Sequence, residues 1–327
     1  MNWKAARRRC WMLRRLAGKK CIVLILVSAY FTTVRRSRQG TVEDAGYGPE
    51  AASPGPPWAL QLKRGASPDQ TYAQLHRLLT TAERHWLCPH PVLVGGRCLA
   101  CWASSSDRVH PQADGEKAVC ADLLRPNCSV LSFGTNHDFS FDLAMEDLDC
   151  TVHAFDPTMG VTGFRRSDRV FFHGVGIGAQ DDFSARFPVA NLGTIIQLIP
   201  LQQDIIDYVK LDVECSEWEV LHQQLTSSGD LLRVRQLAIE FHLWQWKPQL
   251  ADTADERARI AQKQTNQYVH AEDAERFVAV LLSLQAAGFQ LVHSLPYHMC
   301  HVYESGCLPF IVETLWVNTR LSHLTNR

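Results

Sequence analysis

The sequence predicts an α/β fold with a doubly wound, mainly parallel sheet of about seven strands and an antiparallel C-terminal hairpin. Near-continuous apolar runs alternate with helical stretches, which is typical of parallel strands buried on both faces. Five such runs occupy residues 130–133, 151–155, 170–175, 208–211 and 237–241. Two later runs, 289–292 and 310–317, are predicted to form the closing pair of strands. This arrangement is Rossmann-like and fits one domain.

Two segments carry apolar residues at helical spacing. The first is 72–86, where the apolar positions are Leu75, Leu78, Leu79, Ala82 and Trp86. The second is 271–287, where Phe277, Leu281 and Leu284 share one face and Gly288 is placed to end the helix. The stretch 243–270 is an insertion for which the pattern predicts no structure.

The segment 1–36 is predicted to direct the chain into the secretory pathway. Eight lysines and arginines precede an apolar run at 21–34, and three arginines follow it. A basic segment before an apolar run is typical of secretory leaders, and this charge bias keeps the N-terminus cytoplasmic. The run is shorter than the ~20 residues that span a bilayer comfortably. A signal anchor would give a type II membrane protein of the ER or Golgi, and a cleaved signal peptide would give a secreted one. A buried core helix would leave the flanking arginines unexplained.

Residues 37–70 are predicted to form a flexible stem, and 71–327 a single globular domain. The stem is rich in Gly, Pro, Ser and Ala and has too little apolar surface to order itself. The net charge of the chain is −1, so we expect no nucleic-acid partner.

Nine of the eleven cysteines lie outside the leader, and several would pair in an oxidising lumen. Cys300 and Cys307 form the expected pair, because they flank a short, turn-rich loop. Cys88, Cys98 and Cys101 resemble half of a zinc ribbon, but the second Cys-x-x-Cys is missing, so no metal site is predicted. Asn127 begins an N-glycosylation sequon.

Polar residues at the ends of the first two predicted strands suggest a ligand site. Ligands in this fold bind at the carboxyl ends of the strands, near the first strand. Gly134 ends the first strand and would let the backbone approach a ligand closely. Asp156 ends the second and could accept both hydroxyls of a ribose. A turn glycine and a helix-capping aspartate remain the structural alternative.

The fourth and fifth strands carry further charged residues. Lys210, Asp212 and Glu214 are predicted to share one strand face, where charges are costly unless they are paired or functional. An ion pair with Lys210 is the structural alternative to a catalytic role for the two acids. His242 ends the fifth strand and could be a general base or a structural residue.

These motifs resemble the FkbM-type methyltransferases, whose fourth-strand motif reads like Lys-x-Asp-x-Glu-Gly-x-Glu. From about Cys88 to Asn318 the chain is more similar to the animal methyltransferase-like protein 24 family. The matching motifs are Ser-Phe-Gly at 132–134, His-Ala-Phe-Asp-Pro at 153–157, Lys-Leu-Asp-Val-Glu at 210–214, Ile-Glu-Phe-His at 239–242 and Leu-Trp-Val-Asn at 315–318.

The resemblance implies methyl transfer from S-adenosylmethionine to an acceptor that the sequence does not identify. It places Gly134 and Asn136 under the methionine part of the cofactor and Asp156 on its ribose. It also places Asp212 near the sulfonium or the acceptor, with Glu214 beside it.

Three positions depart from the family pattern. Ser132 stands where an acid is usual, Gly134 is the only glycine of the usual Gly-x-Gly, and Cys215 replaces the glycine after Glu214. A non-catalytic binding module with this fold is therefore one alternative. The other is a Golgi-type glycosyltransferase with a metal-binding Asp-x-Asp. The motif at 147–149 fits that pattern but precedes the second strand, at the wrong edge of the sheet.

Overall fold

The computed structural model describes residues 66–97, 114–201, 203–243, 269–297 and 299–322. The predicted leader and most of the predicted stem lie outside these residues, as do Cys98 and Cys101 and most of the predicted insertion. Among the described helices, none has the length and apolarity needed to cross a membrane. The described residues belong to one compact unit.

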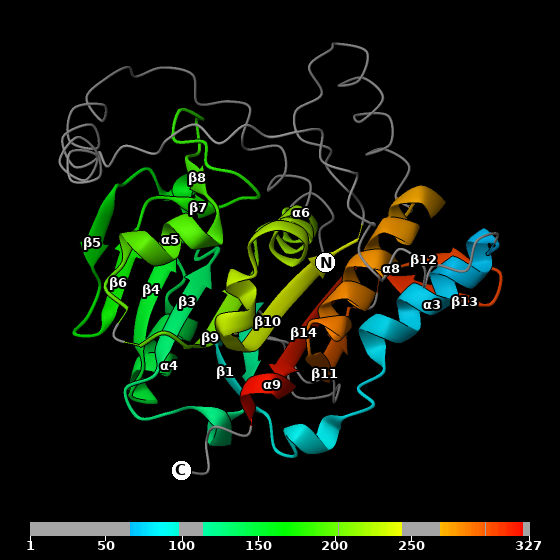
Figure 1. The fold of residues 1–327 in the computed structure, drawn as a ribbon, viewed down its shortest axis with the longest axis horizontal. Helices are drawn as coiled ribbons and strands as arrows, with labels where there is room; N and C mark the ends of the chain where they lie inside the picture. The colour runs from blue at the N-terminus through cyan, green and yellow to red at the C-terminus, as the bar shows by residue number, and fades with distance from the viewer. Residues whose placement is uncertain (1–65, 98–113, 202, 244–268, 298, 323–327) are drawn as a thin grey trace, which may run out of the picture. The chain divides into compact units, whose positions relative to one another are not determined.

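An eight-stranded sheet forms the centre of this unit (Figure 1), in the order β11-β14-β10-β9-β3-β4-β6-β5. Five neighbouring strands are parallel, whereas β14 runs antiparallel to β10 and β11, and β5 runs antiparallel to β6. The strands are β3 (Ser129–Phe133), β4 (Thr151–Phe155), β5 (Gly163–Arg165), β6 (Val170–His173), β9 (Ile206–Leu211), β10 (Val234–His242), β11 (Phe289–Pro296) and β14 (Ile311–Asn318). The predicted α/β fold with an antiparallel C-terminal hairpin is confirmed. The short edge strand β5 was not predicted.

Both faces of the sheet are covered, which explains why β3, β9 and β10 are buried along their whole length. Apolar residues of α3, α5, α6 and α8 form one core with one face of the sheet. The other face packs on α4 and on an antiparallel hairpin of β1 and β2. These elements are α3 (Pro68–Thr80), α4 (Ser140–Asp147), α5 (Leu192–Leu198), α6 (Glu217–Gln223), α8 (Ala271–Ala286), β1 (Val92–Arg97) and β2 (Asp114–Val119).

The N-terminal helix begins earlier and ends earlier than the sequence predicts. Ser67 and Gln70 form a reciprocal capping box, and Pro68 occupies the first turn, so α3 begins within the range predicted as stem. The helix ends at Thr80, and Trp86 is 61% exposed in a separate 3-10 turn, so its predicted place on the helix face is wrong.

The second long helix, α8, matches its prediction to within one residue. Gly288 follows its C-cap with a φ of +103°, the left-handed geometry that ends helices.

Among the described residues, three disulfides fasten the periphery of the domain. Cys300–Cys307 closes the hairpin of β12 (Cys300–Tyr303) and β13 (Gly306–Pro309), as predicted. Cys128–Cys150 joins the starts of β3 and β4. Cys88–Cys120 closes the base of the β1–β2 hairpin, so Cys88 is not part of a zinc half-site.

The amino ends of the parallel strands form an edge separate from the predicted ligand site. Asn127 is exposed there, whereas Cys128 and Ser129 of its sequon are buried. Asp149 makes an ion pair with Arg169 at 2.7 Å at the same edge, so the Asp-x-Asp motif lies where the sequence placed it.

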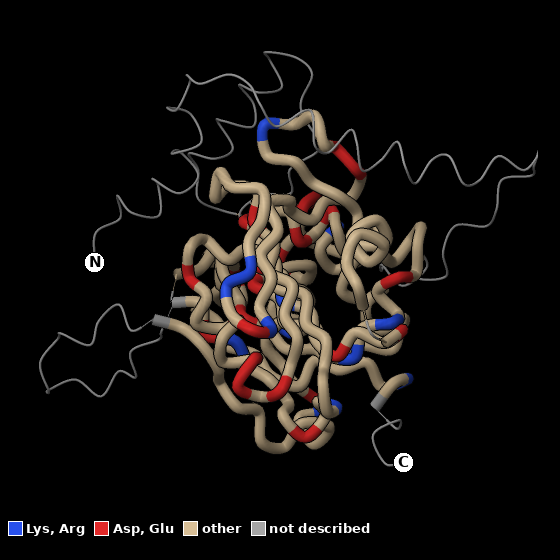
Figure 2. The backbone as a smooth tube through the Cα atoms, turned by 90° about the vertical axis from the view of Figure 1, so that its left-hand side faces the viewer, with Lys and Arg blue, Asp and Glu red and all other residues tan. Residues whose placement is uncertain are grey.

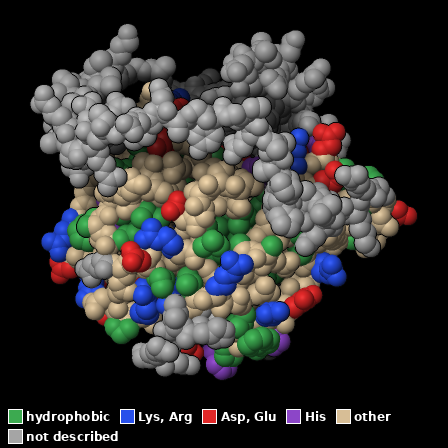
Figure 3. Space-filling view, in the orientation of Figure 1, with side chains coloured by type: hydrophobic (Ala, Val, Ile, Leu, Met, Phe, Trp, Pro, Cys, Tyr) green, Lys and Arg blue, Asp and Glu red, His purple; other side chains and the backbone are tan. Residues whose placement is uncertain are grey.

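Lysines and arginines are interspersed with acids along the chain (Figure 2). On the face seen in Figure 3, apolar side chains lie in small groups between charged and polar ones.

Candidate active site

The predicted site residues come from separate segments, and the structure brings them to one edge of the sheet. Strands β3, β4, β9 and β10 are parallel, so their carboxyl ends share that edge. The chain order reverses at β3, which lies between β4 and β9, and this is where ligands bind in open α/β sheets. Gly134, Asp156 and Asp212 each follow directly after one of these strands, and His242 ends β10.

Gly134 lies against the end of β9. Its φ is +86°, and a Cβ at this position would lie 1.8 Å from the backbone carbonyl oxygen of Asp212. The Asp212 N–H donates to the carbonyl of Phe133 at 3.2 Å, so this close approach belongs to the sheet itself. Packing within the chain therefore requires a glycine here. Ligand approach, the reason that the sequence suggested, is not needed to explain it.

Asp156 is buried and fixes the loop that follows β3. Its Oδ2 accepts from the N–H of Asn136 at 2.7 Å. Its Oδ1 accepts from the N–H and hydroxyl of Thr158 at 2.8 and 2.6 Å. Asn136 adopts a left-handed φ of +43° to make its contact. The two predicted cofactor residues are thus bonded to each other, and Asp156 also caps a 3-10 turn, as the structural alternative expected.

An acid from a helix lies beside the position where the family's first-strand acid is missing. Asp142 of α4 is buried near Ser132 and Lys210. Burial raises the pKa of Asp142 to about 6, although the Lys210 ammonium opposes this shift. The hydroxyl oxygen of Thr135 is buried without a hydrogen-bond partner among the described residues.

Asp212 contacts two lysines, of which the sequence indicated one. Lys210 Nζ lies 3.7 Å from Asp212 Oδ2, but its short hydrogen bond, 2.7 Å, goes to the carbonyl of Gly134. Lys117 Nζ of β2 lies closer to Asp212 Oδ2, at 3.3 Å. The predicted ion pair with Lys210 therefore exists, but Lys117 is the closer cation.

Lys117 is 1% exposed and also contacts Glu240 at 3.0 Å and Glu313 of the paired strand β14. Burial alone would lower the pKa of Lys117, but Asp212, Glu313 and Glu240 together raise it well above its usual value. Burial and the neighbouring Glu240 raise the pKa of Glu313 well above its usual value. By contrast, Lys117 and His242 overcome burial and hold the pKa of Glu240 well below it.

His242 lies among acids at the end of β10. Its Nδ1 is 3.1 Å from Glu217 Oε1, and its Nε2 is 3.4 Å from Glu240 Oε1. Burial would lower the pKa of His242, but Glu217 and Glu240 outweigh burial and raise it well above the usual value. A doubly protonated imidazole has no lone pair for accepting a proton. The geometry thus disfavours a general-base role for His242 at neutral pH.

Glu214 does not lie on a strand. β9 ends at Leu211, and Glu214 and Cys215 follow in a turn with φ values of +54° and +81°. The prediction that Glu214 shares a strand face with Lys210 and Asp212 is therefore wrong. Its side chain is 51% exposed and lies 3.9 Å from His242 Nε2. Partial burial raises the pKa of Glu214, and the nearby carboxylates of Asp212 and Glu240 raise it further.

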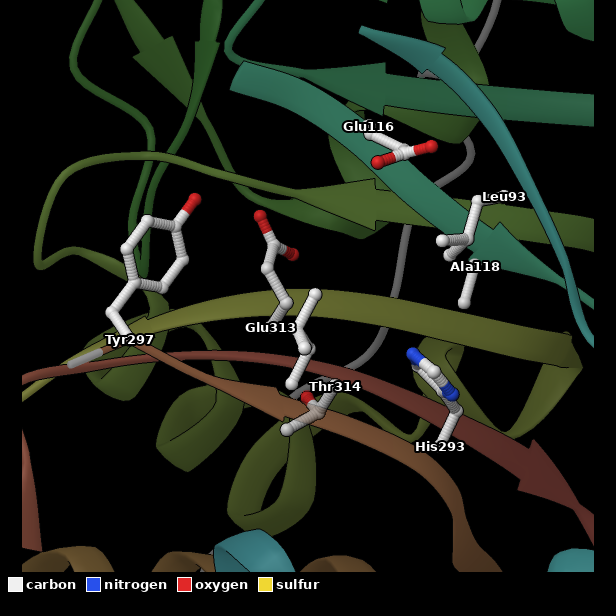
Figure 4. A pocket seen from close by; sticks show the side chains of 8 residues that line it. Leu93, Glu116, Ala118, His293, Tyr297, Glu313 and Thr314 are labelled. Carbon is white, nitrogen blue, oxygen red and sulfur yellow. The ribbon is translucent and has the colours of Figure 1, made fainter. Parts of the chain in front are cut away.

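A recess lies between the β1–β2 hairpin and the β11–β14 pair (Figure 4). Glu313 belongs both to its wall and to the group of acids around Lys117. None of the predicted cofactor residues lines it. The lining residues are Leu93, Glu116, Ala118, His293, Leu295, Tyr297, Glu313 and Thr314.

A family model described as a methyltransferase domain matches residues 99–274, just over half of the chain. The chain belongs to this family. The match contains the ends of β3, β4, β9 and β10, and with them Lys117 and every predicted site residue.

Curated relatives of the methyltransferase domain confirm the resemblance that the motifs indicated. The chain is 31% identical over 141 residues to the probable methyltransferase-like protein 24 of Homo sapiens, a match that covers 38% of each chain. It is 29% identical over 137 residues to the protein of the same name from Rattus norvegicus, over 40% of this chain and 37% of that one. The matched region thus spans well under half the length of these relatives.

Solved structures similar to the methyltransferase domain include two putative methyltransferases. One, from an antibiotic biosynthesis pathway of Anabaena variabilis, has a TM-score of 0.27 and 10% identity over 55% of this chain and 62% of that one. The other, from Thermoplasma acidophilum, has a TM-score of 0.25 and 13% identity over 60% of this chain and 70% of that one.

The methyltransferase domain also holds residues that sequence reasoning missed. Lys117 lies far from every recognised motif, and Glu313 lies just before the motif at 315–318 but is not part of it. The one available signal was a charged residue within an apolar strand pattern, which describes Glu313 in 310–317 and Glu240 in 237–241.

Proposed function

We propose that this chain is an S-adenosylmethionine-dependent methyltransferase of the secretory pathway. The observation that carries the proposal is the convergence of Gly134, Asn136, Asp156 and Asp212 at the point where the strand order reverses. The cofactor would supply an activated methyl group. The protein's own task is then to align the acceptor, which can contribute about 7–11 kcal/mol, and to remove a proton where the acceptor requires it.

The residues at the end of β3 and β4 fit this cofactor. Thr135 Oγ1 is buried without a hydrogen-bond partner in the described part of the chain and can bond to a ligand's polar group. Asp156 accepts three hydrogen bonds within the chain, and a carboxylate has about four acceptor sites. One position therefore remains for a ribose hydroxyl. A second becomes available if the Asn136 N–H turns away, which the left-handed backbone at this residue favours because it is strained.

Glu214 is the best-placed proton acceptor on the acceptor side. It is half exposed, its pKa is raised toward neutrality, and it adopts a strained backbone conformation of the kind that clusters at active sites. Asp212, held by Lys117, would orient the acceptor. His242 in its protonated form would stabilise the charge of Glu214 rather than remove a proton.

The secretory location is part of the proposal and is supported by the leader and by three disulfides. Protein from an oxidising host should show these pairs in non-reducing peptide mapping. If every thiol is free and alkylatable in protein taken from its native cells, the location is wrong.

Cofactor binding tests the site directly. S-adenosylmethionine and S-adenosylhomocysteine should bind in a calorimetric titration, and Asp156→Ala should weaken both roughly tenfold or more, because charge-assisted hydrogen bonds are lost. Thr158→Val is the matched control, since it removes one bond to Asp156 Oδ1 but no cofactor contact. Absence of binding to the folded wild-type chain would refute the proposal.

Transfer of a labelled methyl group to a lumenal extract separates an enzyme from a non-catalytic binding module. Glu214→Gln should keep cofactor affinity and lose about 10²–10⁴-fold in rate, the usual effect of removing a general base. The departures at Ser132 and Gly134 favour the binding-module alternative, and tight cofactor binding without transfer to any fraction would establish it.

A further inference from the structure

The carboxyl ends of β9 and β10 and the start of β14 surround the buried ammonium group of Lys117. Asp212 Oδ2 lies 3.3 Å away and Glu240 Oε2 lies 3.0 Å away, and Glu313 Oε1 is also in contact. The lysine comes from β2, on the hairpin whose base is closed by Cys88–Cys120. Its ammonium group thus reaches the site from outside the eight-stranded sheet.

The same acids form part of a metal ligand set. Asp212, Glu240 and His242 each offer one ligand atom, and these atoms lie within 4.8 Å of one another. Carboxylate oxygens and the nitrogens of a neutral imidazole are ligands that Mn²⁺ and Zn²⁺ accept, so His242 would release a proton on binding the ion. Two of the three groups, Asp212 and Glu240, already bind the Lys117 ammonium. A divalent ion bound to these oxygens would lie beside the lysine charge, so the two cations exclude each other.

We propose that Lys117 is the resident cation of this site, occupying the place of a divalent metal ion and positioning Asp212 and Glu240 at the acceptor end. Lys117 acts here as a positioning residue, through the carboxylates that it holds. The consequence for catalysis rests on the proposed methyl transfer. The proposal that Lys117 occupies the place of a metal ion does not depend on methyl transfer.

Lys210 shows why Lys117 has this role. Both lysines approach Asp212 Oδ2, at 3.7 and 3.3 Å. Lys210, however, donates to the carbonyls of Gly134 and Phe133, so it serves the loop after β3. Of these two lysines, only Lys117 bridges Asp212 to the acids of β10 and β14. Removing its charge leaves three carboxyl groups facing one another, which is the electrostatic condition for binding a divalent ion.

The test replaces Lys117 in the full chain with disulfides intact and measures Mn²⁺ binding by the loss of the free-ion EPR signal. Lys117→Met, which removes the charge and keeps an unbranched side chain one atom shorter, should bind Mn²⁺ at least about tenfold more tightly than the wild type. Its melting temperature should rise with added Mn²⁺. Lys117→Arg keeps a positive charge at this position, and Lys210→Met leaves the Lys117 charge among its acids. Neither variant should therefore bind Mn²⁺ more tightly than the wild type. Adding Asp212→Asn to Lys117→Met should abolish the gain.

Two results would overturn the inference: wild-type protein that binds Mn²⁺ as tightly as Lys117→Met, or a Lys117→Met protein that gains no affinity. If Lys117→Met folds only when Mn²⁺ is present, the metal has taken the place of the lysine, and the inference stands. If it stays unfolded with Mn²⁺, the inference fails. No methyl donor enters this assay, so its outcome is independent of cofactor binding. Once transfer is measured, EDTA should leave the wild-type rate unchanged, and a chelator-sensitive rate would also contradict the inference.

Discussion

Replacing Gly134 with alanine separates the two reasons for a glycine at this position. Its φ of +86° is strained for any residue with a Cβ, and the added carbon would lie 1.8 Å from the Asp212 carbonyl oxygen. Gly160 is the matched control, because its φ is +73° and no atom of the described residues lies within 4 Å of the position that a Cβ would take. The left-handed strain costs about 1–2 kcal/mol at both sites. Overpacking adds about 1–3 kcal/mol at Gly134 alone.

The assay is thermal unfolding of both variants, with cofactor affinity measured on the folded protein. A domain of this size loses about 2–4 °C of melting temperature per kcal/mol. Gly160→Ala should therefore melt about 2–8 °C below the wild type and Gly134→Ala about 4–20 °C below it. Equal melting shifts, combined with a selective loss of cofactor affinity in Gly134→Ala, would refute the packing argument and restore ligand approach as the reason for this glycine.

Three further variants test other parts of the structure. His153 Nδ1 and His173 Nε2 lie 2.9 Å apart, and burial lowers the pKa of both to about 4, so the unfolded chain takes up protons first as the pH falls. The free energy of unfolding should fall by about 2 kcal/mol per histidine between about pH 7 and pH 5. In urea unfolding, a variant with both histidines replaced by phenylalanine should not show this loss. Asp142→Asn should stabilise the fold by up to about 3 kcal/mol at neutral pH. The raised pKa of Asp142 means that the wild type loses stability as the pH rises from about 4 to 6, and the neutral asparagine avoids this loss. A destabilised variant would mean that Lys210 needs the charge of Asp142. Cys215→Gly should be about 1 kcal/mol more stable than Cys215→Ala, since only glycine is unstrained at a φ of +81°, and the reverse order in chemical denaturation would contradict this.

The parallel strands were predictable because burial on both faces leaves a continuous apolar run in the sequence. The runs at 130–133 and 151–155 therefore correspond to β3 and β4 almost residue for residue. The β1–β2 hairpin was not predictable, because three glycines and several charged residues interrupt its pattern. Trp86 was misplaced because an apolar residue at helical spacing does not show that the helix has already ended at Thr80.

The site was predictable only where it follows directly from strand ends. Gly134, Asp156 and Asp212 are adjacent to recognisable strands, and parallel pairing brings their ends together. Lys117 could not be found in this way, since its role depends on how a hairpin docks on the sheet. Cys215 stands where the family pattern has glycine, and its left-handed backbone is a conformation that favours glycine.

The buried lysine also sets an order of events during biosynthesis. Lys117 and Glu313 are 196 residues apart, so at about 5–20 residues per second the ribosome needs roughly 10–40 s to supply the second after the first. Cys88 and Cys120 are only 32 residues apart, and the hairpin can be closed covalently long before β14 exists. Throughout that interval the hairpin carries an ammonium group without its full set of acids. The nascent domain can complete its charge balance only when one of its last strands docks, so a chain interrupted before β14 would leave this lysine incompletely paired.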